Sequence, residues 1–221
     1  MKLKAHQRII REQKAKENPL SLFPEKPDII DLKKAVVRKI NYQTAEKIII
    51  EYEWLGNMPT YCTHYFGIYF NGICGGVVVF GIGIPKNVLE DICGKEHLPE
   101  VRVLTRGACV HWTPTGSATK LIANSLKLLK KEGYKIIVAY SDVRAGEIGT
   151  IYQACNFLYT GSSFGGSEVL MGTKKEIKEL RKKLKYKILL YPKRSDAVEV
   201  SREIHANTIG EGKGQFLDTA Q

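Results

Sequence analysis

The chain has 221 residues, of which 43% are hydrophobic, and a formal net charge of +11. This length fits one domain with extensions, and the longest apolar stretch, GICGGVVVFGIGI, is too short and too rich in glycine for a membrane span of about 20 residues. The N-terminus, MKLKAHQRII, runs into charged sequence and lacks the apolar core of a signal peptide, so we expect a cytoplasmic protein.

The first 30 residues are predicted to form a basic, polar extension. Residues 1–16 alone hold six Lys or Arg and one Glu. Residues 31–56, DLKKAVVRKINYQTAEKIIIEYEWLG, are predicted as one helix, because apolar residues fall near one face at Ile48, Tyr52 and Leu55.

Residues 63–84 are predicted as two strands around Asn71-Gly72, a dipeptide that suits a tight hairpin because both residues tolerate positive φ. Residues 101–111, VRVLTRGACVH, follow as a further strand. Residues 117–133, SATKLIANSLKLLKKEG, are predicted as a helix with lysines near its end and a glycine stop.

Residues 134–142 then form a buried strand, residues 149–156 a short helix and residues 157–163 another strand. The order of a hairpin, a strand, a helix, a strand, a helix and a strand predicts an α/β fold with a mixed sheet. The tail from residue 210, GEGKGQFLDTAQ, is expected to be loose.

The five cysteines are odd in number and show neither a CxxC motif nor a Cys/His zinc spacing. We expect reduced thiols, which agrees with a cytoplasmic setting. Cys109 and Cys155 lie in apolar stretches, where packing is a better explanation than nucleophilic catalysis.

The segment TPTGSATK joins a strand to the start of a helix and could bind a phosphate. The first N–H groups of a helix lack intrahelical acceptors and point along its positive dipole. The candidate ligands are therefore the backbone amides of Gly116, Ser117, Ala118 and Thr119, together with the hydroxyls of Ser117 and Thr119. Alternatively, Ser117 only caps its own helix and binds no ligand.

This series of elements resembles the acyl-CoA-binding half of the GNAT acetyltransferase superfamily. The resemblance implies a GNAT-like mixed β-sheet flanked by helices, acetyl-CoA as cofactor with its pyrophosphate at the helix start, and a tyrosine near the thioester sulfur. GTIYQACNF puts Tyr152 in that position. TPTGSAT lacks the usual Arg/Gln-x-x-Gly-x-Gly/Ala loop, so the fold is implied more firmly than the cofactor.

More specifically, the block YSDVRAGEIGTIYQACNFLYTG, with EYEWLGNMP, THYFGI and LTRGACV upstream, resembles the Mom-type DNA-modification proteins of phages from about Ile48 to Lys193. That family modifies the N6 of adenine in phage DNA with a methylcarbamoyl-type group, which protects the DNA from restriction in the bacterial host. VRAGEIGT lacks the Gly-His pair that the family often has before Gly-Thr, and YSD stands where it often has Tyr-Ala-Asp.

Asp142 ends a central strand, where α/β sheets open their ligand crevice. An adenine amine loses a proton as it is acylated, and a nearby carboxylate could accept that proton. Tyr152 could protonate the leaving thiolate. The alternative for Asp142 is a capping or turn-forming role after the strand.

The resemblance also implies site roles for His64, Tyr65 and Arg106. His64 could transfer a proton or bind a metal, since iron is associated with the family, or it could be a hydrogen-bonded rim residue. Consecutive strand residues point to opposite faces, so His64 and Tyr65 should not both line one pocket. Arg106 could bind a phosphate of CoA or DNA, or be a surface charge.

A second basic stretch, residues 174–194, holds ten Lys or Arg and two Glu. A DNA-modifying enzyme could use it to contact phosphates, and the candidates are Lys174, Lys175, Arg181, Lys182, Lys183 and Lys185. A solvated helix face is the alternative. The adenine must be flipped out or unpaired, and Tyr61, Tyr65, Tyr69 and Tyr159 could stack on it or simply pack in the sheet.

The sequence thus predicts a basic extension at 1–30, a GNAT-like catalytic domain at 31–195 and a tail at 196–221. Two alternatives to a DNA-modifying enzyme stay open. One is an ordinary GNAT N-acetyltransferase of a protein or small amine, and the other is a GNAT-like nucleic-acid-binding module without catalysis.

Overall fold

A computed structural model describes residues 5–17, 26–83, 85–142, 145, 147, 149–163 and 213–219. The chain divides into two compact units, one formed by Met1–Gly83 with Leu104–Leu128 and the other by Ile84–Val103 with Leu129–Gln221. No helix in the described ranges has the length and apolar character needed to cross a membrane.

In the first unit the strand order is β1 (Val36–Lys39), β2 (Cys62–Phe70), β3 (Ile73–Gly81) and β4 (Val101–Cys109). The hairpin between β2 and β3 confirms the prediction made from Asn71-Gly72. These two residues have φ of 45° and 85°, and both being positive fits the tight turns whose twist matches that of the strands.

The prediction of one helix over residues 31–56 was wrong at its N-terminal end. The segment holds strand β1, and only Tyr42–Tyr52 forms a helix, α2. Asn41 begins α2, because its side-chain Oδ1 accepts the Thr44 N–H at 2.9 Å, a strong N-cap interaction. The β-branched Val36-Val37 pair before it favours a strand, and β1 pairs antiparallel with β2.

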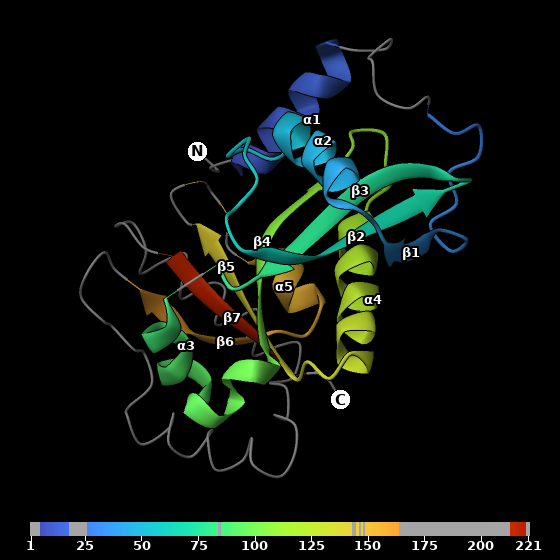
Figure 1. Ribbon diagram of the computed structural model, residues 1–221. Helices are drawn as coiled ribbons and strands as arrows, with labels where there is room; N and C mark the ends of the chain where they lie inside the picture. The colour runs from blue at the N-terminus through green and yellow to red at the C-terminus, as the bar shows by residue number, and fades with distance from the viewer. Residues whose placement is uncertain are drawn as a thin grey trace. The chain divides into compact units, whose positions relative to one another are not determined.

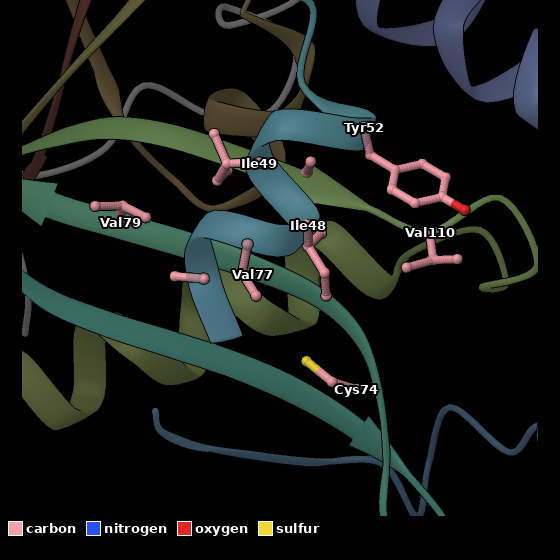
Figure 2. Packing of buried hydrophobic residues seen from close by; sticks show 9 residues of the cluster. Ile48, Ile49, Tyr52, Cys74, Val77, Val79 and Val110 are labelled. Carbon is pink, nitrogen blue, oxygen red and sulfur yellow. The ribbon is translucent and has the colours of Figure 1, made fainter. Parts of the chain in front are cut away.

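The core of the first unit lies between α2 and the sheet. Figure 2 shows Ile48 and Ile49 of α2 close to Val77 and Val79 of β3, with Tyr52 at the C-terminal end of the helix. All five side chains are at most 2% exposed. Burying a side chain of this size contributes about 1.5–3 kcal/mol, so this cluster fixes α2 on the sheet.

Helix α1 (His6–Glu17) was not predicted and lies against α2 (Figure 1). The Gln7 side chain donates to the Tyr52 carbonyl and accepts the Trp54 N–H at 3.1 Å. Lys14 pairs with Glu51 at 3.5 Å. The basic N-terminal segment is therefore held on the fold by polar contacts at the end of α2.

In the second unit the strand order is β4, β5 (Ile136–Asp142), β7 (Lys213–Thr219) and β6 (Leu158–Ser163). The expectation of a loose tail was wrong, because β7 pairs antiparallel with both β5 and β6. Strand β7 pairs along both of its edges, and its sequence, KGQFLDT, does not by itself identify either partner strand.

Helices α3 (Lys86–Cys93) and η1 (Lys95–Glu100), also not predicted, lie between β3 and β4 in the chain. The second unit has its own core, in which α3 packs on β4 and β5 through buried residues: Leu89, Cys93, Val101, Val103, Ile136 and Val138.

Helix α4 (Ser117–Lys131) and helix α5 (Thr150–Ala154) confirm the two helices predicted after β4. Gly133, at φ 96°, ends α4 as expected. A helical crossover between neighbouring strands β4 and β5 is the connection of parallel strands. The α/β class and the mixed sheet flanked by helices are thus confirmed.

Candidate functional site

Asp142 and the residue that Tyr152 contacts, Tyr140, both lie near the end of β5, within the second unit. Asp142 is the last residue of the strand and is partly exposed. The Tyr152 hydroxyl, on α5, donates to the carbonyl of Tyr140 at 3.2 Å. Helix α5 therefore returns to β5 two residues before Asp142, and the predicted acid–base pair shares one end of the strand.

The turn after β5 is closed by backbone groups, since the Asp142 carbonyl accepts the Glu147 N–H at 3.0 Å. The Tyr152 ring packs against Phe157, with centroids 5.4 Å apart. Burial raises the pKa of Tyr140 to about 12, so its phenol stays protonated at neutral pH. Tyr140 therefore provides a carbonyl acceptor and an apolar ring at this strand end.

The first turn of α4 fits an anion through its backbone. Gly116 is exposed and has φ 92°, and α4 is 15 residues long, so its dipole favours negative charge at this end. Ser117 does not fit as a hydroxyl ligand, because its side chain is buried and its Oγ donates to the Pro114 carbonyl at 2.7 Å. The Ser117 N–H points to the same carbonyl at 3.2 Å.

Four residues at the start of α4 were predicted to bind a phosphate. The structure uses the Ser117 side chain to hold the turn, and the roles of the other three stay predictions. Lys120, one turn into α4, donates from Nζ to the carbonyl of Lys33 at 2.9 Å and to that of Leu32. These bonds hold residues 32 and 33 beside the helix start.

Ala118→Glu should separate an anion site from a structural helix start. An acidic residue in the first turn interacts favourably with the helix dipole, so the variant should keep its fold. The same charge would repel a pyrophosphate, and we expect at least about a tenfold loss of acetyl-CoA affinity in calorimetry. Ala118→Gln is the matched neutral control. Equal affinity of the two variants would place the pyrophosphate elsewhere.

His64 and Tyr65 point to opposite faces of β2, as predicted. In the β2–β3 register Tyr65 stands opposite Val79 and His64 opposite Phe80. The Tyr65 side chain packs on the α2 cluster, the buried side chains of α2 and β3 around Ile48 and Val77. The Tyr65 hydroxyl donates to the Cys62 carbonyl at 3.2 Å, and burial raises its pKa. His64 Nδ1 lies 2.7 Å from the Thr63 hydroxyl. A single pocket on one face of β2 cannot take both rings.

Arg106 lies in β4 and is held by the end of α2 and the loop after it. Its Nε is 3.8 Å from Glu53 Oε2 and donates to the Asn57 carbonyl at 3.3 Å. Its terminal nitrogens donate to Asn57 Oδ1 at 3.1 Å and to the Thr105 carbonyl at 2.8 Å. The Arg106 side chain is only 20% exposed, so Arg106 is a positioned cation and not a loose surface charge.

Glu53 and Asn57 are functional candidates that the sequence reasoning missed. Glu53 is buried, and its carboxylate accepts the Leu55 N–H at 2.8 Å. Burial raises its pKa, while Arg106 and the amides of Leu55 and Gly56 partly oppose the rise. Both residues stand in EYEWLGNMP, a motif that carries the family resemblance but suggests no role for its individual members.

A scan with a family model matches residues 34–187 to the Mom protein family. The chain belongs to this family. The match covers both strands of the hairpin, Arg106, the start of α4 and the Asp142–Tyr152 strand end. No curated protein matches this Mom family chain.

Several solved structures of acetyltransferases are similar to the Mom family chain. They include the IAA acetyltransferase from Bacillus cereus ATCC 14579 at 11% identity and a TM-score of 0.46, covering 85% of this chain and 100% of that one. A Bacillus subtilis acetyltransferase in complex with CoA has the same identity, TM-score and coverage. An N-acetyltransferase from Staphylococcus aureus Mu50 has 13% identity and a TM-score of 0.47, covering 84% and 98%.

Several predictions for this Mom family protein lie beyond the residues that carry structure. The six basic DNA-contact candidates, Lys174, Lys175, Arg181, Lys182, Lys183 and Lys185, fall outside the described ranges. Within those ranges, no group of three or more His, Cys, Asp or Glu side chains is placed to hold a metal ion, at His64 or elsewhere.

All five cysteines of the Mom family protein lie in the described residues, and none of them is paired in a disulfide there. Cys109 and Cys155 are buried. Burial raises the pKa of Cys109 to about 11, so its thiol is protonated at neutral pH and a poor nucleophile. The packing role predicted for Cys109 agrees with this.

Proposed function

We propose that this protein is a transferase that modifies adenine in phage DNA. It would modify the exocyclic N6 amine, for which the family resemblance implies a methylcarbamoyl-type product, and so protect the DNA from restriction. The step assigned to the residues of this chain is acyl transfer, in which the bond from N6 to the acyl carbon forms, the thioester C–S bond of acetyl-CoA breaks, and CoA leaves as the thiol. The nitrogen of a methylcarbamoyl group has to come from a further nitrogen donor, because the acyl group of acetyl-CoA contains none. Membership of the Mom protein family supports the proposal. The observation that carries it is the strand end where Asp142 closes β5 and the Tyr152 hydroxyl donates to the Tyr140 carbonyl.

In this proposal Asp142 accepts a proton from the adenine amine as the new bond forms. An exocyclic amine is a weak nucleophile, and a carboxylate within hydrogen-bond reach would orient it and remove the proton. Tyr152 is the proton donor to the leaving group. Its present bond to the Tyr140 carbonyl sets the direction of the hydroxyl and would be exchanged for the leaving group during the reaction.

Acetyl-CoA, when bound, supplies a thioester-activated acyl group. The residues of this chain that would hold its pyrophosphate are Gly116, Ala118 and Thr119, through backbone N–H groups at the start of α4. Ser117 would shape the turn through its bonds to Pro114. Arg106 would contact a phosphate of the cofactor or of the DNA with the N–H groups that its protein partners do not use.

The DNA partner is inferred from charge. Residues 1–16 and 174–194 carry sixteen of the 34 Lys and Arg residues but only three of the 23 Asp and Glu residues. Such a localised excess suits contacts with phosphates, which provide affinity without reading sequence.

Neutralising Lys182, Lys183 and Lys185 with Gln should weaken binding to all DNA sequences about equally. The slope of log affinity against log salt should fall by roughly 0.9 for each phosphate that the protein no longer neutralises. Fluorescence anisotropy with two unrelated duplexes over a salt series measures both effects. Lys86, Lys130 and Lys131 changed to Gln form the matched control on described helices. An unchanged slope in the first variant would put the DNA surface elsewhere.

Co-expression of the protein with a plasmid, followed by mass spectrometry of the plasmid nucleosides, tests the whole proposal. A modified adenosine that depends on the protein is the expected result. Unmodified DNA together with acetylation of a protein or small amine would favour an ordinary N-acetyltransferase. DNA binding without any acyl transfer would favour a non-catalytic module.

A further inference from the structure

Tyr61 is an exposed aromatic residue in an unfavourable backbone conformation. It directly precedes β2, the residue is 76% exposed, and its φ is 62°. Left-handed backbone costs an L-residue other than glycine about 1–2 kcal/mol. Strain of this kind persists only where the surroundings enforce it, and it concentrates at ligand sites.

The surroundings that enforce the conformation are visible at the end of β3. The Tyr61 carbonyl accepts the Ile82 N–H at 3.2 Å. Gly81 lets the two backbones approach, because a Cβ added there would lie 2.3 Å from the Tyr61 carbonyl oxygen. The tight backbone contact fixes the residue while its ring stays in solvent.

The loop that carries Tyr61 also holds Arg106. Asn57, four residues earlier, accepts two hydrogen bonds from the guanidinium. Cys62, the next residue, donates from Sγ to the Pro59 carbonyl at 3.0 Å and packs on the α2 cluster. Burial raises the pKa of the Cys62 thiol, and a hydrogen bond with Thr105 and the charge of Arg106 partly oppose that rise.

Arg106 keeps donors for a ligand. A guanidinium has five N–H groups, and its three nitrogens make the bonds to Asn57 and Thr105 described above. Within the described ranges these bonds use one hydrogen of each nitrogen, so each terminal nitrogen retains a second N–H. Phosphate oxygens match this fork geometry.

Two other tyrosines that could stack on a base already pack against protein groups. Tyr65 meets the Tyr42 ring edge-on at 5.9 Å. The Arg38 guanidinium lies 4.0 Å from the centre of the Tyr69 ring. Ile82, whose N–H donates to the Tyr61 carbonyl, is 48% exposed, so an apolar side chain adjoins the residue that carries the exposed ring.

We propose that Tyr61 and Arg106 form a binding site for an unpaired nucleotide of DNA, in which the Tyr61 ring stacks on the base and Arg106 binds the adjacent phosphate. The site rests on the proposed DNA substrate and deepens it by naming the single-stranded form. A guanidinium held by the loop that carries an exposed ring combines the two groups that single-stranded nucleic acids require, a cation for the charged backbone and a ring on which a base can stack.

The test compares Tyr61→Asn with Tyr61→Phe in the full chain. Asn tolerates positive φ and so keeps the loop conformation without a ring, and Phe keeps the ring without the hydroxyl. The probe is a fluorescent single-stranded oligonucleotide, measured by anisotropy beside the corresponding duplex. Tyr61→Asn should weaken single-strand binding about 5- to 150-fold, the range for one base stacked on an aromatic ring.

Tyr61→Phe should stay within about twofold of the natural protein, and duplex binding by basic stretches should change little in either variant. Ile50→Asn, which alters an exposed apolar residue of α2, is the matched control and should bind both probes normally. Photocrosslinking of an oligonucleotide containing 5-iododeoxyuridine should label the peptide that contains Tyr61.

Single-strand affinity that Tyr61→Asn leaves unchanged would overturn the site. So would a loss of self-association in sedimentation of Tyr61→Asn, which would assign the exposed ring to a second copy of the chain. The proposed function is read separately from plasmid nucleosides. If the natural protein modifies adenine and Tyr61→Asn still binds the single strand normally, only the Tyr61–Arg106 site is wrong. If the natural protein neither modifies adenine nor binds DNA, the proposed function and the site are both wrong.

Discussion

Asp142→Asn should lower the fraction of modified adenine in plasmid DNA by about 10²–10⁴-fold, the usual effect of losing a general base. Asn keeps the size of the side chain but is a far poorer proton acceptor. The turn after β5 should survive, because the Asp142 backbone carbonyl accepts the Glu147 N–H. The measurement is nucleoside mass spectrometry at matched soluble protein levels.

Tyr152→Phe tests, in the same assay, the role of Tyr152 as proton donor to the leaving group. It removes only the hydroxyl that donates to the Tyr140 carbonyl and keeps the ring that packs on Phe157.

If Asp142 only forms a turn, the Asp142→Asn variant should modify DNA at a near-normal level, and the catalytic assignment of Asp142 would then be wrong. Acetyl-CoA affinity of Asp142→Asn should match that of the natural protein in either case.

Local patterns predicted the parts of the fold that local interactions determine. The Asn71-Gly72 turn and the glycine stop of α4 follow from backbone preferences that each residue carries by itself. The prediction of one helix over residues 31–56 was wrong because the helical spacing of apolar residues near the end of the segment was extended backwards over Val36-Val37. There pairing with β2 decides the structure, and the segment itself contains no sign of that partner.

Long-range pairing also explains the two larger failures. Strand β7 depends on β5 and β6, which lie far earlier in the chain. The site around Arg106 depends on Glu53 and Asn57, which a single sequence gives no reason to join to β4. Asp142 and Tyr152 were easier to pair, since a strand end and the next helix are close along the chain.

Arg106→Ala should destabilise the first unit by about 3–5 kcal/mol at neutral pH, because it leaves the buried Glu53 carboxylate without its cation. The free energy of unfolding can be followed by urea titration with tryptophan fluorescence. The chain has two tryptophans, and Trp54 adjoins Glu53. Glu53→Gln combined with Arg106→Ala removes both charges and should recover most of the loss.

The pH dependence of this loss identifies the ion pair as its cause. The pKa of Glu53 is raised on folding, burial being the largest effect, so the native state holds the proton more tightly than the unfolded state. Stability therefore falls as pH rises from the unfolded value near 4.5 through the folded pKa. Removing Arg106 raises the folded pKa of Glu53 further, so the stability of the variant keeps falling to a higher pH.

The difference in the free energy of unfolding between Arg106→Ala and the natural protein should accordingly be small below pH 4.5 and reach its full size above the variant's folded Glu53 pKa. A difference that is the same at every pH, or a double variant no more stable than Arg106→Ala, would mean that Arg106 stabilises the fold by packing and not by its charge.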